Sequence, residues 1–223
     1  MKKVLCACLC LFLLSGCHQE KDQKVSLQEE TIAYGDINFD QFHCGDIINL
    51  QNIRYLSNLA IPGRWKHSLI YLGSLKQVQE VVESQHSYYQ KIVKHFHTGE
   101  EKLVLDANST GVKIRTFQEM ANLKKESYLK ALTCYRLKKD NQFIQSFIEK
   151  AMDYYDTPYD FEMNTQDDSA LYCSELIYRA LQKNDIELHS VSEVLNYDVI
   201  TPTDLIDELQ EKNLVEHVLI LEK

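Results

Sequence analysis

Glycine is scarce in this sequence, and positive charge is in deficit. The 223 residues include 7 glycines, none of them in a phosphate-loop pattern, so no nucleotide site is predicted. Lysine and arginine together number 24 against 33 aspartates and glutamates, which makes the formal net charge −9. Because a nucleic-acid-binding surface needs positive charge, this balance argues against nucleic acid as a partner. Contents of 44% hydrophobic and 26% charged residues are ordinary for a globular protein.

A hydrophobic run long enough to span a bilayer is also missing. The apolar residues 4–14 fall short of the roughly 20 that a spanning helix takes. They follow two lysines near the start, which is typical of a secretory signal peptide. Residues 14–17, Leu-Ser-Gly-Cys, resemble the lipobox of bacterial lipoproteins, in which the cysteine carries lipid and becomes the new N-terminus. The sequence therefore predicts a signal peptide over residues 1–16 and a lipid-bearing Cys17.

This start of the chain also predicts where the protein is and how its domain begins. Lipid on Cys17 would anchor the protein to a membrane on the extracytoplasmic side of the bacterial cell envelope. The alternative is an ordinary signal peptide whose Cys17 is incidental. Residues 18–30 are polar and without periodicity, as in a flexible tether. We place the lipidated N-terminus and tether at residues 17–38 and a single folded domain of ordinary size at residues 39–223.

Few cysteines remain for that domain. Four of the 7 cysteines belong to the export segment, which leaves Cys44, Cys134 and Cys173. Three cysteines at wide spacing fit neither a disulfide framework nor a zinc site. His95 and His97 stand two residues apart, but no further ligand follows at a suitable spacing. We therefore predict no metal and no cofactor, and we ask whether one of the free thiols reacts.

The hydrophobic pattern predicts an α+β domain. Period-two and short apolar runs predict strands at residues 45–50, 67–73, 103–107, 112–115, 128–137 and 214–221. Helical spacing predicts helices at residues 141–155, 173–182 and 203–211, helical turns over 52–60, and a helical insert over 76–101. The strands stand mostly in the middle of the chain with helices between and after them, which is not the regular alternation of a parallel α/β fold.

Cys173 is the strongest chemical candidate because of its place at the start of a predicted helix. Free backbone N–H groups and the positive end of the helix dipole favour a thiolate there, and the thiolate is the nucleophilic form. The same N–H groups could donate to an oxyanion on an attacked carbonyl. The alternative is that Cys173 is a small buried hydrophobic residue.

A cysteine nucleophile needs a base and a group that orients the base. Of the 8 histidines, His67 opens an apolar strand, from which a rigid sheet could aim its ring into a cleft. Asp106 interrupts the apolar run at residues 103–107 and would lie near His67 if the two strands pair. Each also has a purely structural interpretation. His67 would be a histidine whose ring nitrogens are hydrogen-bonded within the fold, and Asp106 a turn residue that ends its strand.

Several segments together resemble the permuted papain-like branch of the NlpC-type hydrolases, the YiiX-like group. The most specific is Pro-Tyr-Asp-Phe at residues 158–161 leading to Leu-Tyr-Cys-Ser-Glu-Leu at residues 171–176. The others are residues 45–48, 65–73, 105–112 and 200–205, so that the resemblance spans roughly residues 42–206. It implies a circularly permuted papain-like fold, in which an antiparallel sheet packs against helices that include the cysteine-bearing one.

The resemblance also implies roles for the candidate residues. Cys173 corresponds to the nucleophile, His67 to the base and Asp106 to the orienting group. The family often has glutamate in the third position, so Asp106 is a departure with a shorter side chain. Asp160 and Glu175 are the alternative orienting groups.

The resemblance and the predicted location together indicate a function. They predict a cysteine hydrolase of the amidase or peptidase type that cleaves an amide bond in cell-wall peptide, with Tyr159 and Tyr172 as candidate substrate contacts. One alternative is a lipid acyl hydrolase or acyltransferase related to the lecithin–retinol acyltransferase-like group. Another is a non-catalytic envelope-binding lipoprotein. The expected partners are a peptide or acyl substrate and, through Cys17, a membrane.

Overall fold

The computed structural model describes residues 31–52, 61–120, 129–163, 165, 167–194 and 196–223. The predictions for the signal peptide, for Cys17 and for the first part of the tether lie outside these residues, as do nearly all of the helical turns expected over 52–60. Within the described part of the chain, no helix is long and apolar enough to cross a bilayer.

Strands and helices follow one another in the mixed order that the hydrophobic pattern predicts. The strands are β1 (Ile47–Asn52), β2 (His67–Gly73), β3 (Leu103–Asn108), β4 (Gly111–Thr116), β5 (Leu129–Leu137), β6 (Ser192–Val194), β7 (Tyr197–Val199) and β8 (Val215–Glu222). The helices are η1 (Tyr34–Asp36), η2 (Phe39–Gln41), α2 (Leu75–Val81), α3 (Ser87–Val93), α4 (Phe117–Met120), α5 (Asn141–Met152), α6 (Cys173–Gln182) and α7 (Pro202–Glu211).

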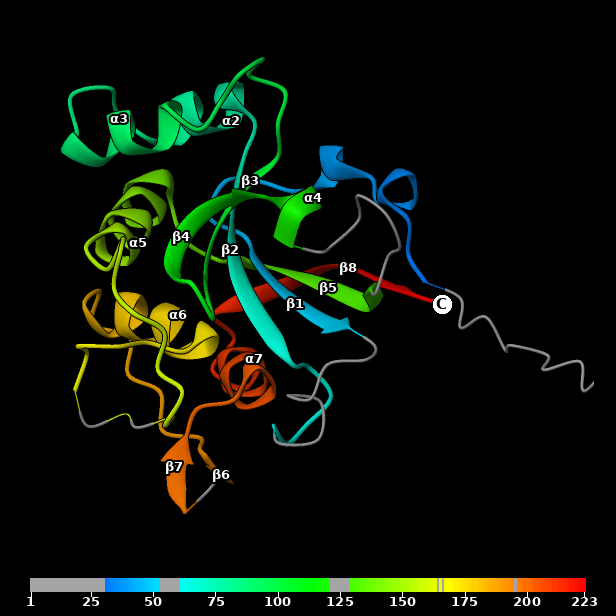
Figure 1. Cartoon of the computed structure of the whole chain (residues 1–223), viewed down its shortest axis with the longest axis vertical. Helices are drawn as coiled ribbons and strands as arrows, with labels where there is room; N and C mark the ends of the chain where they lie inside the picture. Colours follow the sequence, from blue (N-terminus) through cyan, green and yellow to red (C-terminus); the bar gives the residue numbers. More distant parts are fainter. Residues whose placement is uncertain (1–30, 53–60, 121–128, 164, 166, 195) are drawn as a thin grey trace, which may run out of the picture.

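Six strands form one antiparallel sheet in the order β4-β3-β2-β1-β5-β8 (Figure 1). The short strands β6 and β7 form a separate hairpin. The predicted α+β class is therefore confirmed, with every neighbouring pair in the large sheet antiparallel. The β6–β7 hairpin was not predicted, because strands of three residues carry too little hydrophobic alternation to be recognised.

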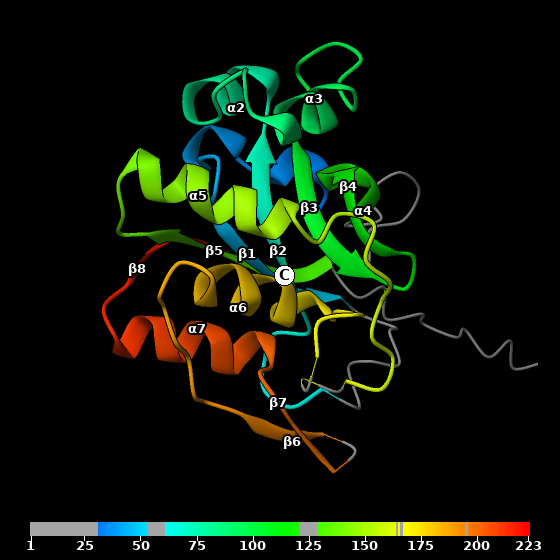
Figure 2. The same ribbon diagram turned by 90° about the vertical axis from the view of Figure 1, so that its left-hand side faces the viewer.

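The long helices cover one face of the large sheet (Figure 2). Two of them, α5 and α7, begin at a residue whose side chain caps the helix. Asp140 caps α5 by accepting a hydrogen bond from the Phe143 backbone N–H, and Thr201 caps α7 in the same way, with Pro202 as the first helical residue. The apolar stripe of α5, which includes Ile144 and Phe147, is buried against this face.

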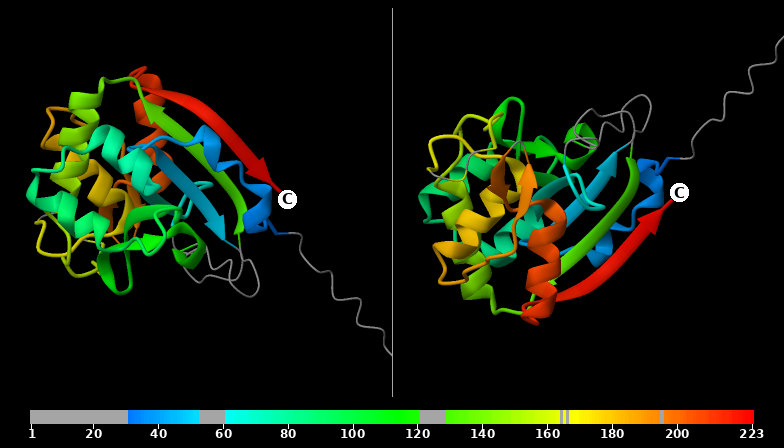
Figure 3. Two further views of the ribbon diagram at one scale, coloured as in Figure 1. Left: turned by 90° about the horizontal axis from the view of Figure 1, so that it is seen from above. Right: turned by 90° about the horizontal axis from the view of Figure 1, so that it is seen from below.

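The other face of the sheet is covered by residues at the start of the described chain (Figure 3). Ile32 and Ile37 are 1% and 6% exposed, and they pack into a second core with Phe42 and Phe117. The packed domain thus begins before residue 39, where we had placed its start. The reason is that the inner strands are apolar on both faces, and residues 31–42 supply the hydrophobic cover that the second face needs.

The predicted insert at residues 76–101 contains α2 and α3, and these helices belong to the main core. Val78 of α2 and Ile92 of α3 are fully buried there, and Tyr88 donates a hydrogen bond from its hydroxyl to the Gln145 carbonyl of α5. The insert therefore packs beside α5 and adds to the helical layer.

Candidate active site

His67 and Asp106 meet across two neighbouring strands. Ile70 of β2 pairs with Leu105 of β3, and side chains alternate between the two faces of a strand. His67 precedes Ile70 by three residues and Asp106 follows Leu105 by one, so the alternation places the two side chains on the same side of the β2–β3 pair. The His67 Nε2 atom lies 3.1 Å from the Asp106 Oδ2 atom, which is a hydrogen-bonding distance.

Cys173 reaches the same place from a helix. It is the first residue of α6, which packs on β2 and β3, and Tyr172 is the N-cap. The Cys173 sulfur forms a hydrogen bond with the His67 ring, and the backbone N–H groups of Ser68 and Ser174 donate to it. Because Nε2 of His67 is engaged by Asp106, the ring nitrogen left for the sulfur is Nδ1. The three predicted catalytic residues are thus brought together.

The electrostatics of the pair favour a thiolate and an imidazolium. Burial alone would raise the pKa of Cys173, but the positive His67 ring and the hydrogen bonds to the sulfur outweigh it and lower that pKa. Burial alone would lower the pKa of His67, but the Cys173 thiolate and the hydrogen bond to Asp106 raise it to about 10. The two groups exchange one proton, so the shifts belong to the pair. Between the two pKa values the nucleophilic form is the resting state.

Solvent reaches this pair mainly at the imidazole. Cys173 is 3% exposed, whereas the side chain of His67 is 19% exposed and that of Asp106 is fully buried. A low exposure keeps water away from the ion pair and strengthens it.

Asp106 has a second partner that the sequence did not single out. Arg115 of β4 directs its Nη1 atom at Asp106 Oδ1, and the same nitrogen lies 3.3 Å from the Asp106 carbonyl oxygen. A lone arginine on a predicted strand carries no signal of such a role, because its partner is nine residues away and is fixed by the strand register.

These observations agree with a comparison to known families. The pattern of the permuted papain-like amidases, family C92 with YaeF and YiiX, matches residues 41–215. The chain belongs to this family. Its resemblance to the YiiX-like group and its identification as a papain-like hydrolase are thereby confirmed. No curated protein sequence matches the chain.

A solved structure supports the permuted papain-like fold. It is described as the crystal structure of the metalloprotein yiiX from Escherichia coli O157:H7, and it covers 82% of this chain and 99% of its own, with a TM-score of 0.58. At 16% identity the likeness speaks for the fold alone.

That description raises the question of whether this papain-like amidase could hold a metal. Within the described ranges, no group of three or more His, Cys, Asp and Glu side chains is arranged to do so. The histidine and the carboxylate of the active site are also committed, since Asp106 binds His67 through Oδ2 and Arg115 through Oδ1. The positive charge of Arg115 opposes a second cation there. The described residues therefore do not fit a metal ion.

The two predicted substrate contacts of the amidase lie in different surroundings. Tyr159 is part-buried beside Cys173 and Asp106, and burial together with these groups raises the pKa of its hydroxyl. Tyr172 is fully buried, and its hydroxyl accepts a hydrogen bond from the Ile200 backbone N–H. The structure thus keeps Tyr159 next to the nucleophile but puts Tyr172 in the core, where its role is to hold the N-terminus of α6.

Tyr159 is held there by a close approach of two backbones. Gly111, at the turn between β3 and β4, has a φ of 90°, and a Cβ atom on it would lie 2.6 Å from the carbonyl oxygen of Thr157. That same oxygen accepts a hydrogen bond from the Val112 backbone N–H. The ring of Tyr159 then packs in a T-shaped contact with Phe161, which is 69% exposed.

The alternative orienting groups have other partners. Asp160 accepts hydrogen bonds from the backbone N–H groups of Glu162 and Met163, as a turn former does. Glu175 pairs with Arg179 one helical turn further on. Asp106 is the carboxylate that bonds to His67, so the shorter side chain does reach the imidazole.

Buried polar side chains support the site from behind. The Ser68 hydroxyl donates to Asn49 Oδ1 at 2.6 Å, and the Asn49 amide donates to the Pro202 carbonyl at 2.9 Å. The Ser174 hydroxyl donates to the Ile200 carbonyl at 2.7 Å. These bonds tie β1, β2, α6 and the start of α7 together, which fixes the distance between the helix and the strand that carry the reacting groups.

Proposed function

We propose that this amidase cleaves an amide bond in cell-wall peptide, with Cys173 as nucleophile, His67 as acid and base, and Asp106 as the group that orients His67. The observation that carries the proposal is the contact of Cys173 with a His67 ring whose far nitrogen is held by Asp106. A thiolate, a proton donor and an orienting carboxylate in this order are what acyl transfer by cysteine requires.

The first half of the reaction forms an acyl-enzyme. The Cys173 thiolate attacks the carbonyl carbon, and the electron pair of the C=O bond moves to oxygen. The N–H groups of the first turn of α6 stabilise the oxyanion. As the carbon–nitrogen bond breaks, the His67 imidazolium gives its proton to the departing nitrogen. The products are a free amine and a thioester on Cys173.

The second half restores the enzyme. Neutral His67 takes a proton from water, whose oxygen attacks the thioester carbon. The carbon–sulfur bond breaks, the acid product leaves, and Cys173 is again a thiolate beside the imidazolium. Asp106 keeps the ring in one orientation through both halves, since its hydrogen bond holds Nε2 and leaves Nδ1 facing the sulfur.

Two features support a wall substrate. The sequence has the pattern of a signal peptide followed by a lipobox at Cys17, which favours the cell envelope. The described chain also begins on the face of the sheet opposite α6 (Figure 3). With lipid on Cys17, the tether to the membrane would start from one face of the large sheet, and Cys173 would lie on the opposite face. This arrangement favours a substrate away from the anchoring membrane.

The test compares wall peptides with lipids. The full chain, as a bacterial host processes it, is incubated with soluble peptidoglycan fragments or with phospholipid vesicles, and products are identified by mass spectrometry. We expect a new amine and a new carboxylic acid from the wall peptides, lost in Cys173→Ala and His67→Ala and kept in the control Cys44→Ala.

Two results would contradict the proposal. Release of fatty acid from vesicles with intact wall peptides would overturn the substrate and favour the lipid acyl hydrolase. Undiminished hydrolysis by Cys173→Ala would overturn the mechanism.

A further inference from the structure

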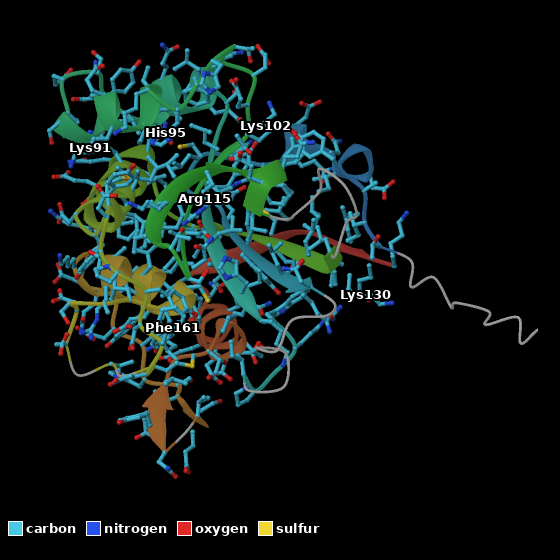
Figure 4. All side chains as sticks on the ribbon, viewed as in Figure 1. Lys91, His95, Lys102, Arg115, Lys130 and Phe161 are labelled. Carbon is cyan, nitrogen blue, oxygen red and sulfur yellow. The ribbon has the colours of Figure 1, made fainter. Side chains whose placement is uncertain are left out.

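The buried carboxylate of the site is shared between two cations on opposite sides. Asp106 is fully buried, and its Oδ2 atom faces His67 while its Oδ1 atom faces Arg115 (Figure 4 labels Arg115). The Arg115 side chain is itself only 15% exposed. Val104 pairs with Arg115 and Asp106 pairs with Lys113, so His67, Asp106 and Arg115 share one face of three adjacent strands.

We propose that Arg115 is a positioning residue whose charge neutralises Asp106, so that the imidazole of His67 is oriented by a nearly neutral partner. The inference rests on the proposed function and adds to it the control of the proton on His67. In papain-like peptidases with a Cys-His-Asn triad, a neutral amide occupies the third position. The ion pair of Asp106 with Arg115 has the same net charge as that amide.

The chemical reason lies in the two tasks of His67. It must hold a proton while Cys173 attacks and release it to the leaving nitrogen afterwards. A buried carboxylate without a counter-ion would hold the proton too tightly for the second task. The charged and titratable groups around His67 are Cys173 from α6, Asp106 from β3 and Tyr159 from the segment before α6. Arg115 supplies the cation on the far side of Asp106.

Arg115 also has a plain structural task, which the experiment must separate. Its Nη2 atom lies 2.9 Å from Asn108 Oδ1 and 3.2 Å from the Gly111 carbonyl oxygen, and it also donates to Thr110 Oγ1. These bonds clamp the turn between β3 and β4. Loss of the clamp would weaken the hairpin in any variant, whether or not the charge matters.

A double-mutant cycle that removes the charges of Arg115 and Asp106 distinguishes the two tasks. Arg115→Met, Asp106→Asn and the double variant are compared with the wild type by the pH dependence of Cys173 alkylation with iodoacetamide and by hydrolysis of wall peptides. Lys113→Met is the matched control, because it removes a cation from the same strand whose partner is Asp156. We expect Lys113→Met to behave as the wild type.

In this cycle, removal of the second charge should partly restore the activity that is lost with the first. Asp106→Asn leaves the positive charge of Arg115 near His67 with no carboxylate to balance it, and the rate of hydrolysis should fall about 100-fold. The double variant removes both charges and should recover at least about tenfold over Asp106→Asn. In Arg115→Met the alkaline limit of hydrolysis should move up by about one pH unit, whereas Arg115→Lys, which keeps the charge, should leave that limit in place.

Two results have distinct meanings. A double variant that is slower than Asp106→Asn, as a purely structural clamp predicts, would overturn the inference while the mechanism stands. An ordinary pH dependence of alkylation in the wild type would overturn the proposed function and the inference with it. If Arg115→Met does not fold, as judged by thermal melting, Arg115→Lys and the double variant still decide between the two tasks.

Discussion

Two buried aspartates, each paired with an arginine and each close to a cysteine, lie at opposite ends of the strands of the large sheet. At one end Arg136 binds Asp46 through two nitrogens, at 3.0 and 2.8 Å, and Asp46 is 1% exposed. The Cys134 thiol donates directly to this carboxylate at 3.5 Å. Burial and the negative charge of Asp46 raise the pKa of Cys134 far above its usual range. That thiol stays protonated.

At the other end an imidazole stands between the carboxylate and the thiol. Arg115 binds Asp106, Asp106 binds His67, and His67 binds Cys173. Burial acts on Cys173 as it does on Cys134, yet the pKa of Cys173 is lowered because its neighbour is the positive ring. Burial and a nearby Asp–Arg pair therefore do not decide whether a cysteine is reactive. The identity of the group in direct contact with the sulfur decides it.

The first test measures the alkylation rates of all three thiols in one experiment. At pH 7 under native conditions we expect iodoacetamide to label Cys173 at least about 1000-fold faster than Cys44 or Cys134, because only its thiolate is stabilised. Burial also raises the pKa of Cys44 above the usual range of a thiol. Time-resolved peptide mass spectrometry measures the three rates.

The control for this measurement is His67→Ala, which should bring the rate of Cys173 close to those of the other two thiols. Equal rates for all three cysteines in the wild type would show that the imidazole does not set the reactivity.

The next test removes the carboxylate at the unreactive end. Asp46→Asn leaves Arg136 without its ionic partner and should lower the free energy of unfolding by about 2 kcal/mol, less than for a fully buried pair because Arg136 is 24% exposed. Urea denaturation measures the loss. The alkylation rate of Cys173 should stay unchanged, since Asp46 lies at the other end of the strands, and a changed rate would mean that the two ends are coupled.

A third acid–arginine pair provides the last test. Glu175 pairs with Arg179 at 3.0 Å, yet burial outweighs the pair and raises the pKa of Glu175 to about 7. A carboxyl group whose pKa is raised in the folded state stabilises the fold at low pH, and this contribution is lost as pH rises through the folded value. The free energy of unfolding of Glu175→Gln should therefore rise by on the order of 2 kcal/mol relative to that of the wild type as the pH goes from 4.5 to 8.

Unfolding curves at a series of pH values test this expectation. The same substitution at solvent-exposed Glu193 is the control for a carboxylate in water. A free-energy difference between wild type and Glu175→Gln that does not change with pH would mean that Arg179 compensates fully for the burial of Glu175.

Much of this architecture follows from local patterns. The strand at residues 67–73 and the helix at residues 173–182 have the predicted bounds, because alternation, a terminal glycine and an amphipathic stripe are encoded within a few residues. The catalytic candidates were also recognisable by residue type and by their place at the start of those elements. The early start of the packed domain was not, since Ile32 and Ile37 follow the polar residues 18–30 and belong to no recognisable strand or helix pattern.

The amino-acid order alone shows which chemical groups are present and on which kinds of element they stand: a thiol at a helix start, an imidazole at a strand start, a carboxylate within an apolar strand. It does not show that these three meet, nor that Arg115 binds the far side of Asp106; both follow from the folded arrangement. The physical reason is that the contacts depend on strand register and on how α6 packs against β2. His67 and Asp106 are separated by 39 positions along the chain, and Asp106 and Cys173 by 67. They become neighbours through interactions that no local pattern contains.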